Sequence, residues 1–245
     1  MKTKIVRLSL AAAMLFGINA AQAGTLAMNG WLFGNGNSVK VNTPSYNGAA
    51  GGFTGTLSGM TDASFNLSPL MMYCVDLAEN ININAGASYG VKMEGELGSA
   101  TFTLVSASSH FSGAIATRLG QLVSYVADTA GAVDDAAKST ALQLAIWNTL
   151  YDSDSSLSGG AFKETGVNSL FRSTADSLLA ASASSLVTKD LYVLRSVGNP
   201  GRQDQLIWID QPDNNNNVPE PASLALVGLA LGGLALSRRR FSAGA

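Results

Sequence analysis

Hydrophobic and polar residues follow two different patterns along this chain of 245 residues. From Gly24 to about Leu104, short apolar runs are separated by turn-like stretches rich in Gly, Asn and Thr, which is typical of β-strands. From about Ile115 the apolar residues recur at helical spacing, and two strand-like runs follow near 191–196 and 205–210. Helices placed between sheet strands predict an α+β fold, in which a β-sheet or sandwich portion carries an inserted helical subdomain.

Three helices are predicted between the two groups of strands. The first covers about 115–128, and the second runs from about 134 to 150, with acidic residues in its first turn, where the helix dipole favours negative charge. The third lies within 166–185. Upstream of them, the segment 64–77 contains a predicted strand that ends in the sequence Met-Met-Tyr-Cys-Val-Asp-Leu.

The N-terminal segment, residues 1–23, has the order of features found in a secretory signal peptide. Three basic residues precede the apolar stretch Leu8–Ile18, and the sequence Ala-Gln-Ala follows at 21–23. Cleavage by signal peptidase after Ala23 leaves Gly24 as the first mature residue. The segment is therefore excluded from any prediction of the fold.

The C-terminal segment, residues 218–245, combines three features in order. A Pro-Glu-Pro triplet comes first, a short apolar span follows, and an arginine cluster lies near the end; these residues are Pro219, Glu220, Pro221, Leu224–Leu236, Arg238, Arg239 and Arg240. Proline fixes φ and lacks an N–H donor, so the triplet ends any preceding structure. The apolar span can enter a bilayer as a short hydrophobic helix, while the arginines stay on the cytoplasmic side.

This segment resembles the PEP-CTERM sorting signal of Gram-negative bacteria. The resemblance implies an exported protein that is held transiently at the inner membrane, cut by an exosortase and released to the cell surface or extracellular matrix. An ordinary tail anchor is the alternative, but the span 222–236 is shorter than the ~20 residues that a permanent membrane helix needs. Residues 212–217 are predicted to be an Asn-rich linker, which leaves 24–211 as the domain.

The charge between the two terminal signals is negative. Of the 15 basic residues, three lie in the signal peptide and three in the arginine cluster, so nine remain against all 17 acidic residues, a net charge near −8. Nucleic acid and anionic membrane surfaces require a basic binding surface. Neither is therefore expected as a partner, and the charge suits an extracellular protein.

The chain contains a single cysteine, Cys74. In an exported protein it cannot close an internal disulfide, so it is a buried apolar residue, a free reactive thiol, an intermolecular link or something less usual. Its sequence context is Tyr-Cys-Val-Asp, and the second predicted helix contains Leu-Gln-Leu-Ala-Ile-Trp with the glutamine at 143.

These two motifs, in this order, resemble the thioester domains of bacterial surface proteins, over roughly Leu70 to Tyr151. In that family the cysteine sulfur is joined to the side-chain carbonyl of the glutamine. The resemblance implies an internal thioester between Cys74 and Gln143. Because Gln143 and Trp147 are four residues apart on a helix and Tyr73 adjoins Cys74, we expect Trp147 and Tyr73 to shield the bond from water.

Other chemistry has little support in the sequence. The only histidine is His110, so a zinc site or a Ser-His-Asp triad is not predicted, and no phosphate-binding loop is present. The acidic pairs at 134–135 and 152–154 have the oxygen ligands that calcium prefers, but a helix start and loop turns explain them equally well. We predict no cofactor, no metal site and no enzymatic turnover.

The favoured hypothesis is an exported adhesin or crosslinker. Its thioester would capture an amine- or hydroxyl-bearing surface ligand, or extracellular polysaccharide matrix, through Gln143. The alternative is a non-reactive structural component of that biofilm matrix, which shares only the export route. A polymer-acting hydrolase fits export but has no catalytic constellation in the sequence.

Overall fold

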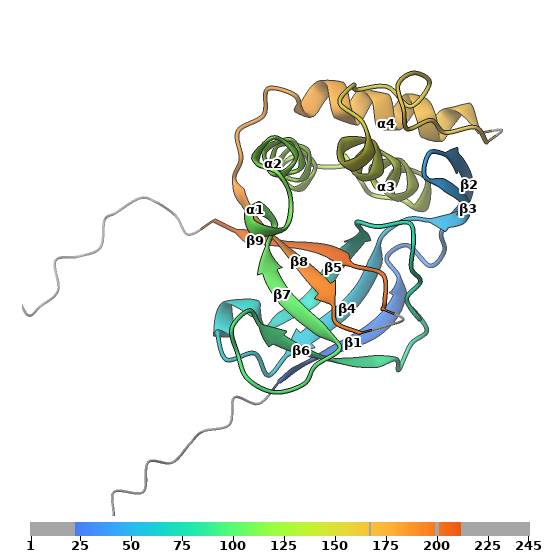
Figure 1. Ribbon diagram of the computed structural model, residues 1–245. Helices are drawn as coiled ribbons and strands as arrows, with labels where there is room; N and C mark the ends of the chain where they lie inside the picture. The colour runs from blue at the N-terminus through green and yellow to red at the C-terminus, as the bar shows by residue number, and fades with distance from the viewer. Residues whose placement is uncertain (1–22, 167, 199–200, 212–245) are drawn as a thin grey trace, which may run out of the picture. The chain divides into compact units, whose positions relative to one another are not determined.

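A closed β-barrel forms the centre of the computed structural model, which describes residues 23–166, 168–198 and 201–211 (Figure 1). Around the barrel the strand order is β1-β4-β5-β9-β8-β7-β6. These strands are β1 Gly24–Trp31, β4 Phe53–Ser58, β5 Leu67–Cys74, β6 Ser88–Met93, β7 Phe102–Ser106, β8 Lys189–Ser196 and β9 Gln205–Asp210. The pairs β1–β4, β1–β6, β4–β5, β5–β9 and β7–β8 are antiparallel, and β6–β7 is parallel.

The barrel is closed by strands from the two ends of the domain. β9 pairs with β5 through Tyr73↔Leu206 and Cys74↔Gln205, and β8 pairs with β7. Side chains on successive strand residues face opposite sides, so Leu70 and Met72 are buried while Met71 between them is 40% exposed.

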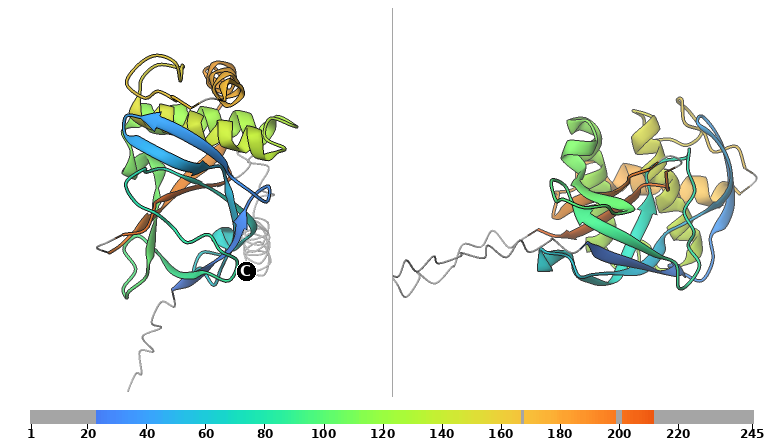
Figure 2. Two further views of the ribbon diagram at one scale, coloured as in Figure 1. Left: turned by 90° about the vertical axis from the view of Figure 1, so that its right-hand side faces the viewer. Right: turned by 60° about the horizontal axis from the view of Figure 1, so that its bottom comes forward.

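Helices are inserted between β7 and β8, as the hydrophobic pattern predicts. They are α1 Ala107–His110, α2 Gly113–Asp128, α3 Ala136–Tyr151 and α4 Ser169–Ser182, and a short 3₁₀ helix, η1, covers Ala63–Phe65. In Figure 1 α2 and α3 lie over one side of the barrel and α4 lies on their outer side, in contact with both. The β2–β3 hairpin, Asn37–Asn42 and Ser45–Ala50, lies against α3 (Figure 2).

Helix α3 is the central helix of this layer. Every residue from Ser139 to Thr149 is buried, because α2, α4 and the hairpin contact the helix and its side chains bond to β5 of the barrel. Its N-cap is Asp135, whose side chain accepts a hydrogen bond from the Lys138 N–H at 2.8 Å. A carboxylate at this position satisfies a helix-end donor and suits the positive end of the dipole.

The α+β prediction is confirmed, with two differences. The sheet closes into a barrel and is not a sandwich, since β9 from the C-terminal part of the domain joins β5. The strand predicted to reach Leu77 ends at Cys74, because β9 pairs with β5 only as far as Gln205 and the chain turns away beyond it. The predicted signal peptide, except Ala23, and the linker and sorting segment lie outside the described residues.

None of the helices in the described part of the chain is long and apolar enough to span a membrane. The predicted sorting helix belongs to residues 212–245, of which the structure says nothing.

Polar side chains on α3 fasten the helix to the barrel. The Ser139 hydroxyl accepts a hydrogen bond from the Gly52 N–H at 2.8 Å and lies 3.1 Å from the Tyr73 hydroxyl. At the next residue, the Thr140 hydroxyl donates to the Ala50 carbonyl at 2.8 Å. Because all these groups are buried, each bond also avoids the cost of an unpaired polar atom.

Replacement of Ser139 by alanine tests this attachment. We expect Ser139→Ala to lower the free energy of unfolding by about 1–3 kcal/mol, because the buried Gly52 N–H and Tyr73 hydroxyl lose a partner. Urea denaturation measures the change. The control is Ser177→Ala on the exposed side of α4, where the hydroxyl bonds only to its own helix at Ser173 and a change within about 0.5 kcal/mol is expected. Equal effects of the two variants would contradict the role given to Ser139.

Candidate functional site

Cys74 and Gln143 meet at the junction of the barrel and the helical layer. The Cys74 N–H donates a hydrogen bond to Gln143 Oε1 at 2.9 Å, and Gln143 Nε2 donates to the Cys74 carbonyl at 2.8 Å. The side-chain amide of the helix therefore binds both backbone groups of the cysteine. The two residues, 69 positions apart in the sequence, are thus brought together as the sequence motifs predict.

The end of a strand explains why a side chain binds there. β4 pairs with β5 only as far as Phe53↔Met72, so no strand lies beside Cys74 on that edge. On the other edge, the Val75 N–H donates to the Asp204 carbonyl. Since backbone groups of successive strand residues point to opposite edges, those of Cys74 point toward the edge that β4 has left. Gln143 takes the place of the missing strand.

Both members of this pair are shielded from solvent. Gln143 is 1% exposed and Cys74 is 4% exposed. A buried primary amide needs hydrogen-bond partners within the protein for its carbonyl and its N–H groups. The Cys74 backbone provides a donor for the Gln143 carbonyl and an acceptor for one of its N–H groups. The pair therefore lies in a water-poor site with the amide fixed in one orientation.

The sulfur of Cys74 has a second amide beside it. Gln205 Nε2 lies 3.6 Å from Sγ, within reach to donate a hydrogen bond, and Oε1 of the same amide lies 3.8 Å from Sγ, within reach to accept the thiol proton. Burial raises the pKa of the Cys74 thiol well above its ordinary value; the Gln205 hydrogen bond opposes this rise, and the negative charge of Asp76 adds to it. Cys74 is a free thiol in this structure.

Each of the two residues predicted to shield the bond is a chain neighbour of one member of the pair: Tyr73 precedes Cys74 on β5, and Trp147 lies one helical turn after Gln143 on α3. Tyr73 is buried, and its desolvation raises the pKa of the phenol to about 12. Its ring is so close to the backbone of Gly52 that a Cβ there would lie 2.6 Å from the ring, so only glycine fits. Trp147 is also buried and packs edge-on against Tyr46, with ring centroids 5.4 Å apart.

Three residues of the site were not predicted from the sequence: Tyr46, Ser139 and Gln205. Tyr46 on β3 is half-buried, and desolvation, with a smaller contribution from the nearby Cys74 sulfur, raises the pKa of its phenol. Ser139 precedes Gln143 by one helical turn, a spacing that could have indicated a shared face. No local signal places Gln205 opposite Cys74, because the pairing of β5 with β9 depends on barrel closure.

Asp76 anchors two loops and lies beyond the end of β5. One carboxylate oxygen accepts from the Glu79 N–H at 3.1 Å and the other from the Asp204 N–H at 2.6 Å. Desolvation raises the pKa of Asp76, although these backbone donors oppose the rise. His110, at the end of α1, lies 3.8 Å from the Asp204 carboxylate, and desolvation lowers the pKa of its imidazole.

The acidic pairs considered for calcium have local partners. Asp135 caps α3, and Asp134 forms an ion pair with Lys138 at 2.7 Å. Asp152 accepts hydrogen bonds from the backbone of Phe162, Ser153 and other loop residues, which lower the pKa of its carboxyl. Within the described residues, no group of three or more His, Cys, Asp or Glu side chains is placed to hold a metal ion.

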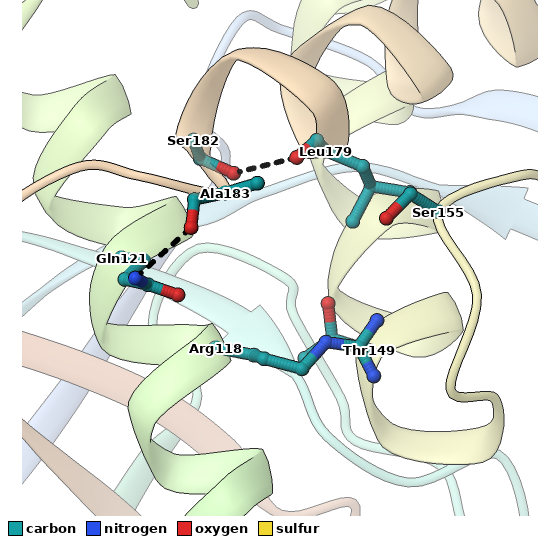
Figure 3. Close-up of a pocket in the computed structure, with 7 residues that line it drawn as sticks. All are labelled: Arg118, Gln121, Thr149, Ser155, Leu179, Ser182 and Ala183. Carbon is teal, nitrogen blue, oxygen red and sulfur yellow. Dashed lines mark hydrogen bonds between the residues drawn. The ribbon is translucent and has the colours of Figure 1, made fainter.

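Cavities lie beside the helical layer. One of about 250 Å³ is lined by residues of α2, α3 and α4 and by Ser155, and Arg118 is among its lining residues (Figure 3). The Arg118 guanidinium donates to the Asp152 and Asp154 carbonyls at 2.8 and 2.9 Å. Neither Cys74 nor Gln143 lines this cavity. Another, of about 240 Å³, is mostly apolar and is bounded by Tyr73 and Leu142, the sequence neighbours of the pair.

Comparison with protein families identifies one segment. The model of the PEP-CTERM protein-sorting motif matches residues 217–240. The chain carries a PEP-CTERM sorting motif. All six residues predicted for the signal, Pro219, Glu220, Pro221, Arg238, Arg239 and Arg240, lie within the match. The PEP-CTERM motif indicates an exported protein that an exosortase processes at the membrane.

The PEP-CTERM match covers the C-terminal segment and leaves the barrel and its helices without a family assignment. Neither the curated proteins nor the solved structures contain a match to the chain. The chemistry of residues 24–211 is therefore inferred from the geometry of the site and from its sequence motifs.

A change of one atom in Gln143 tests the hydrogen-bonded pair directly. In Gln143→Glu, a protonated carboxyl can still accept from the Cys74 N–H and donate to the Cys74 carbonyl, but a carboxylate cannot donate. The folded-state pKa of this carboxyl is therefore expected to rise above its unfolded value of about 4.3. The stabilisation by the protonated carboxyl is then fully present below the unfolded-state pKa. The free energy of unfolding falls by about 3 kcal/mol as the pH rises through the folded-state pKa.

Thermal unfolding between acidic and neutral pH measures this effect. The control is Gln121→Glu on α2, where the amide also donates to a backbone carbonyl, that of Ala183, but is accessible to solvent. Its carboxyl is expected to add no comparable pH dependence. A Gln143→Glu variant with the pH profile of Gln121→Glu would contradict the buried amide-to-backbone geometry.

Proposed function

We propose that this exported protein acts at the cell surface or in the extracellular matrix, where a Cys74–Gln143 internal thioester captures a nucleophile covalently. The observation that supports the proposal is the double hydrogen bond between the Gln143 amide and the Cys74 backbone. It joins the proposed acyl donor to the backbone of Cys74, which carries the only thiol of the chain. The resemblance of the two sequence motifs to thioester domains supports the same chemistry.

Bond formation requires a thiol to displace ammonia from an unreactive amide. In the proposed reaction, Cys74 Sγ attacks Cδ of Gln143, the Cδ–Nε2 bond breaks, and the thiol proton leaves with the nitrogen as ammonia. The Cys74 N–H already points at Oε1, so it stabilises negative charge that develops on this oxygen during the attack. Holding both groups in one orientation replaces a collision between free molecules.

In capture, a nucleophile from another molecule opens the proposed thioester. An amine attacks Cδ of Gln143, the Cδ–Sγ bond breaks, and the proton of the amine passes to the sulfur. The product is an amide that joins Gln143 to the partner, with Cys74 as a free thiol. Each molecule reacts once, so the protein is proposed to be an adhesin or crosslinker and not an enzyme.

Exclusion of water is necessary because hydrolysis would destroy the stored acyl group. The burial of Cys74, Gln143, Tyr73 and Trp147 supports this part of the proposal. Tyr46, which packs on Trp147 and retains partial exposure, lies on the side from which a nucleophile is proposed to enter.

The second candidate function is a non-reactive structural component of the extracellular polysaccharide matrix. The observation in its favour is the strong rise in the pKa of the buried Cys74 thiol, which disfavours the nucleophilic thiolate. In that case the Cys74–Gln143 hydrogen bonds serve only to pack α3 against the barrel.

Intact mass distinguishes the two candidates. A protein with the thioester is lighter by one ammonia than its processed sequence. Methylamine is expected to restore mass by adding to Gln143 while releasing one thiol, and Cys74→Ser and Gln143→Glu are expected to show neither change. Native alkylation alone is uninformative, because a buried free thiol also resists reagents. A full encoded mass in the wild-type protein would exclude the thioester.

Export is tested through the prolines of the sorting motif. We expect deletion of Val218–Ala245, or joint replacement of Pro219 and Pro221 by alanine, to leave the protein in the periplasm, as followed by cell fractionation. The matched control is Pro212→Ala, which lies outside the segment that matches the motif and is expected to leave delivery unchanged. Normal surface delivery of the deleted protein would refute the proposed route.

A further inference from the structure

A buried glutamine other than Gln143, Gln205, contacts the sulfur of Cys74. The capture chemistry described above assigns it no role. Gln205 is the first residue of β9 and is 0% exposed. Its side-chain amide lies within hydrogen-bonding distance of Sγ. A fully buried amide at the start of a strand carries a desolvation cost, and its hydrogen bonds must offset that cost.

The pairing of β5 with β9 brings the two side chains together. Cys74 lies directly opposite Gln205, and the adjacent residue Val75 uses its N–H to bond the Asp204 carbonyl. Cys74 and Gln205 therefore form a pair of opposed residues without a backbone hydrogen bond between them. Side chains approach most closely in such pairs, which places the Gln205 amide against Sγ.

The orientation of the Gln205 amide is fixed by its other partner. Nε2 donates a hydrogen bond to the Gln203 carbonyl at 3.0 Å. This contact identifies the nitrogen end of the amide, because an oxygen there would face a carbonyl oxygen. The nitrogen also lies 3.6 Å from Sγ, so its second N–H is available to the sulfur.

We infer that Gln205 stabilises the thiolate form of Cys74 through this N–H and so promotes both formation and opening of the thioester. The part of the inference that concerns the thioester rests on the proposed function. In formation, the N–H stabilises negative charge on Sγ as the thiol proton passes toward the departing ammonia. In capture, it stabilises the same charge as the Cδ–Sγ bond breaks and before the sulfur takes a proton from the attacking amine. No oxidant or reductant is needed in either step.

The role differs from that of Gln143. Gln143 supplies the acyl carbon, while Gln205 bonds the sulfur, and the two amides contact Cys74 through different groups. A hydrogen bond to a charged group is stronger than one to a neutral group. The N–H of Gln205 therefore favours the thiolate over the thiol, whereas Oε1 of the same amide, which can accept the thiol proton, burial and the charge of Asp76 favour the thiol.

The test compares the purified wild-type protein with Gln205→Met, which has a similar volume but no N–H, and with Gln205→Glu, which places a carboxylate beside the sulfur. The matched control is Gln121→Met on α2. Thermal unfolding confirms that each variant is folded. Two quantities are measured: the rate of the reaction with methylamine, and the pKa of the free Cys74 thiol, followed by NMR of protein labelled with ¹³C at cysteine Cβ.

The thiol measurement has one unambiguous signal, because the chain contains one cysteine. The free thiol is present after methylamine treatment if the thioester forms, and from the outset if it does not. Gln205→Met is expected to slow the methylamine reaction about ten- to a hundredfold and to lower the acid dissociation constant of the Cys74 thiol by a similar factor. Gln205→Glu is expected to lower this dissociation constant further, and Gln121→Met is expected to match the wild type.

The outcomes separate this inference from the proposed function. A wild-type protein of full encoded mass overturns the thioester, yet its thiol pKa still tests whether Gln205 stabilises the thiolate. A wild-type protein with the thioester, together with a folded Gln205→Met variant whose thiol pKa and methylamine rate are unchanged, overturns the role of Gln205. If Gln205→Met does not fold, the folded Gln205→Glu variant gives the same decision, because an unchanged thiol pKa beside a carboxylate would equally refute the contact.

Discussion

The edge of β5 that β4 leaves open at Cys74 is the constraint on which the site depends. A backbone N–H and carbonyl buried there need partners, and the protein supplies them from the side chain of Gln143 on α3. This residue pair is thereby one of the points at which the helix is fixed to the barrel. The same contact joins the carboxamide of Gln143 to the backbone of the residue that carries the thiol, so one arrangement meets the structural need and supports the proposed chemistry.

Further polar contacts make that arrangement rigid. Ser139 and Thr140, on the same helix as Gln143, bond the backbone where the chain passes from β3 to β4. Gln205 approaches the sulfur from the opposite strand of the barrel. Cys74 is thus held between groups from the helical layer and the barrel. Loss of any one of these buried hydrogen bonds would leave a polar group unpaired, which costs free energy.

The sequence predicts local features of this protein better than its long-range pairings. Helical spacing of apolar residues gives α2, α3 and α4 closely, and the motifs around Cys74 and Gln143 identify a pair that proves to be in contact. Closure of the barrel and the role of Gln205 cannot be read in this way, because strand pairing between distant segments leaves no local pattern. The sorting motif is recognisable for a different reason, since its signal lies in the order of its residues.

The hydrogen bond from Gln143 Nε2 to the Cys74 carbonyl also bears on which adducts the site accommodates. The proposed thioester formation would remove this nitrogen and leave the carbonyl oxygen without its donor. Capture of an amine would restore a nitrogen at the same place with one hydrogen still attached, so the former contact could be rebuilt around the new linkage. Capture of an alcohol would insert an oxygen with no hydrogen to donate, and the ester would leave the strand edge unfilled. In the proposed reaction the backbone would therefore favour an amide linkage over an ester linkage.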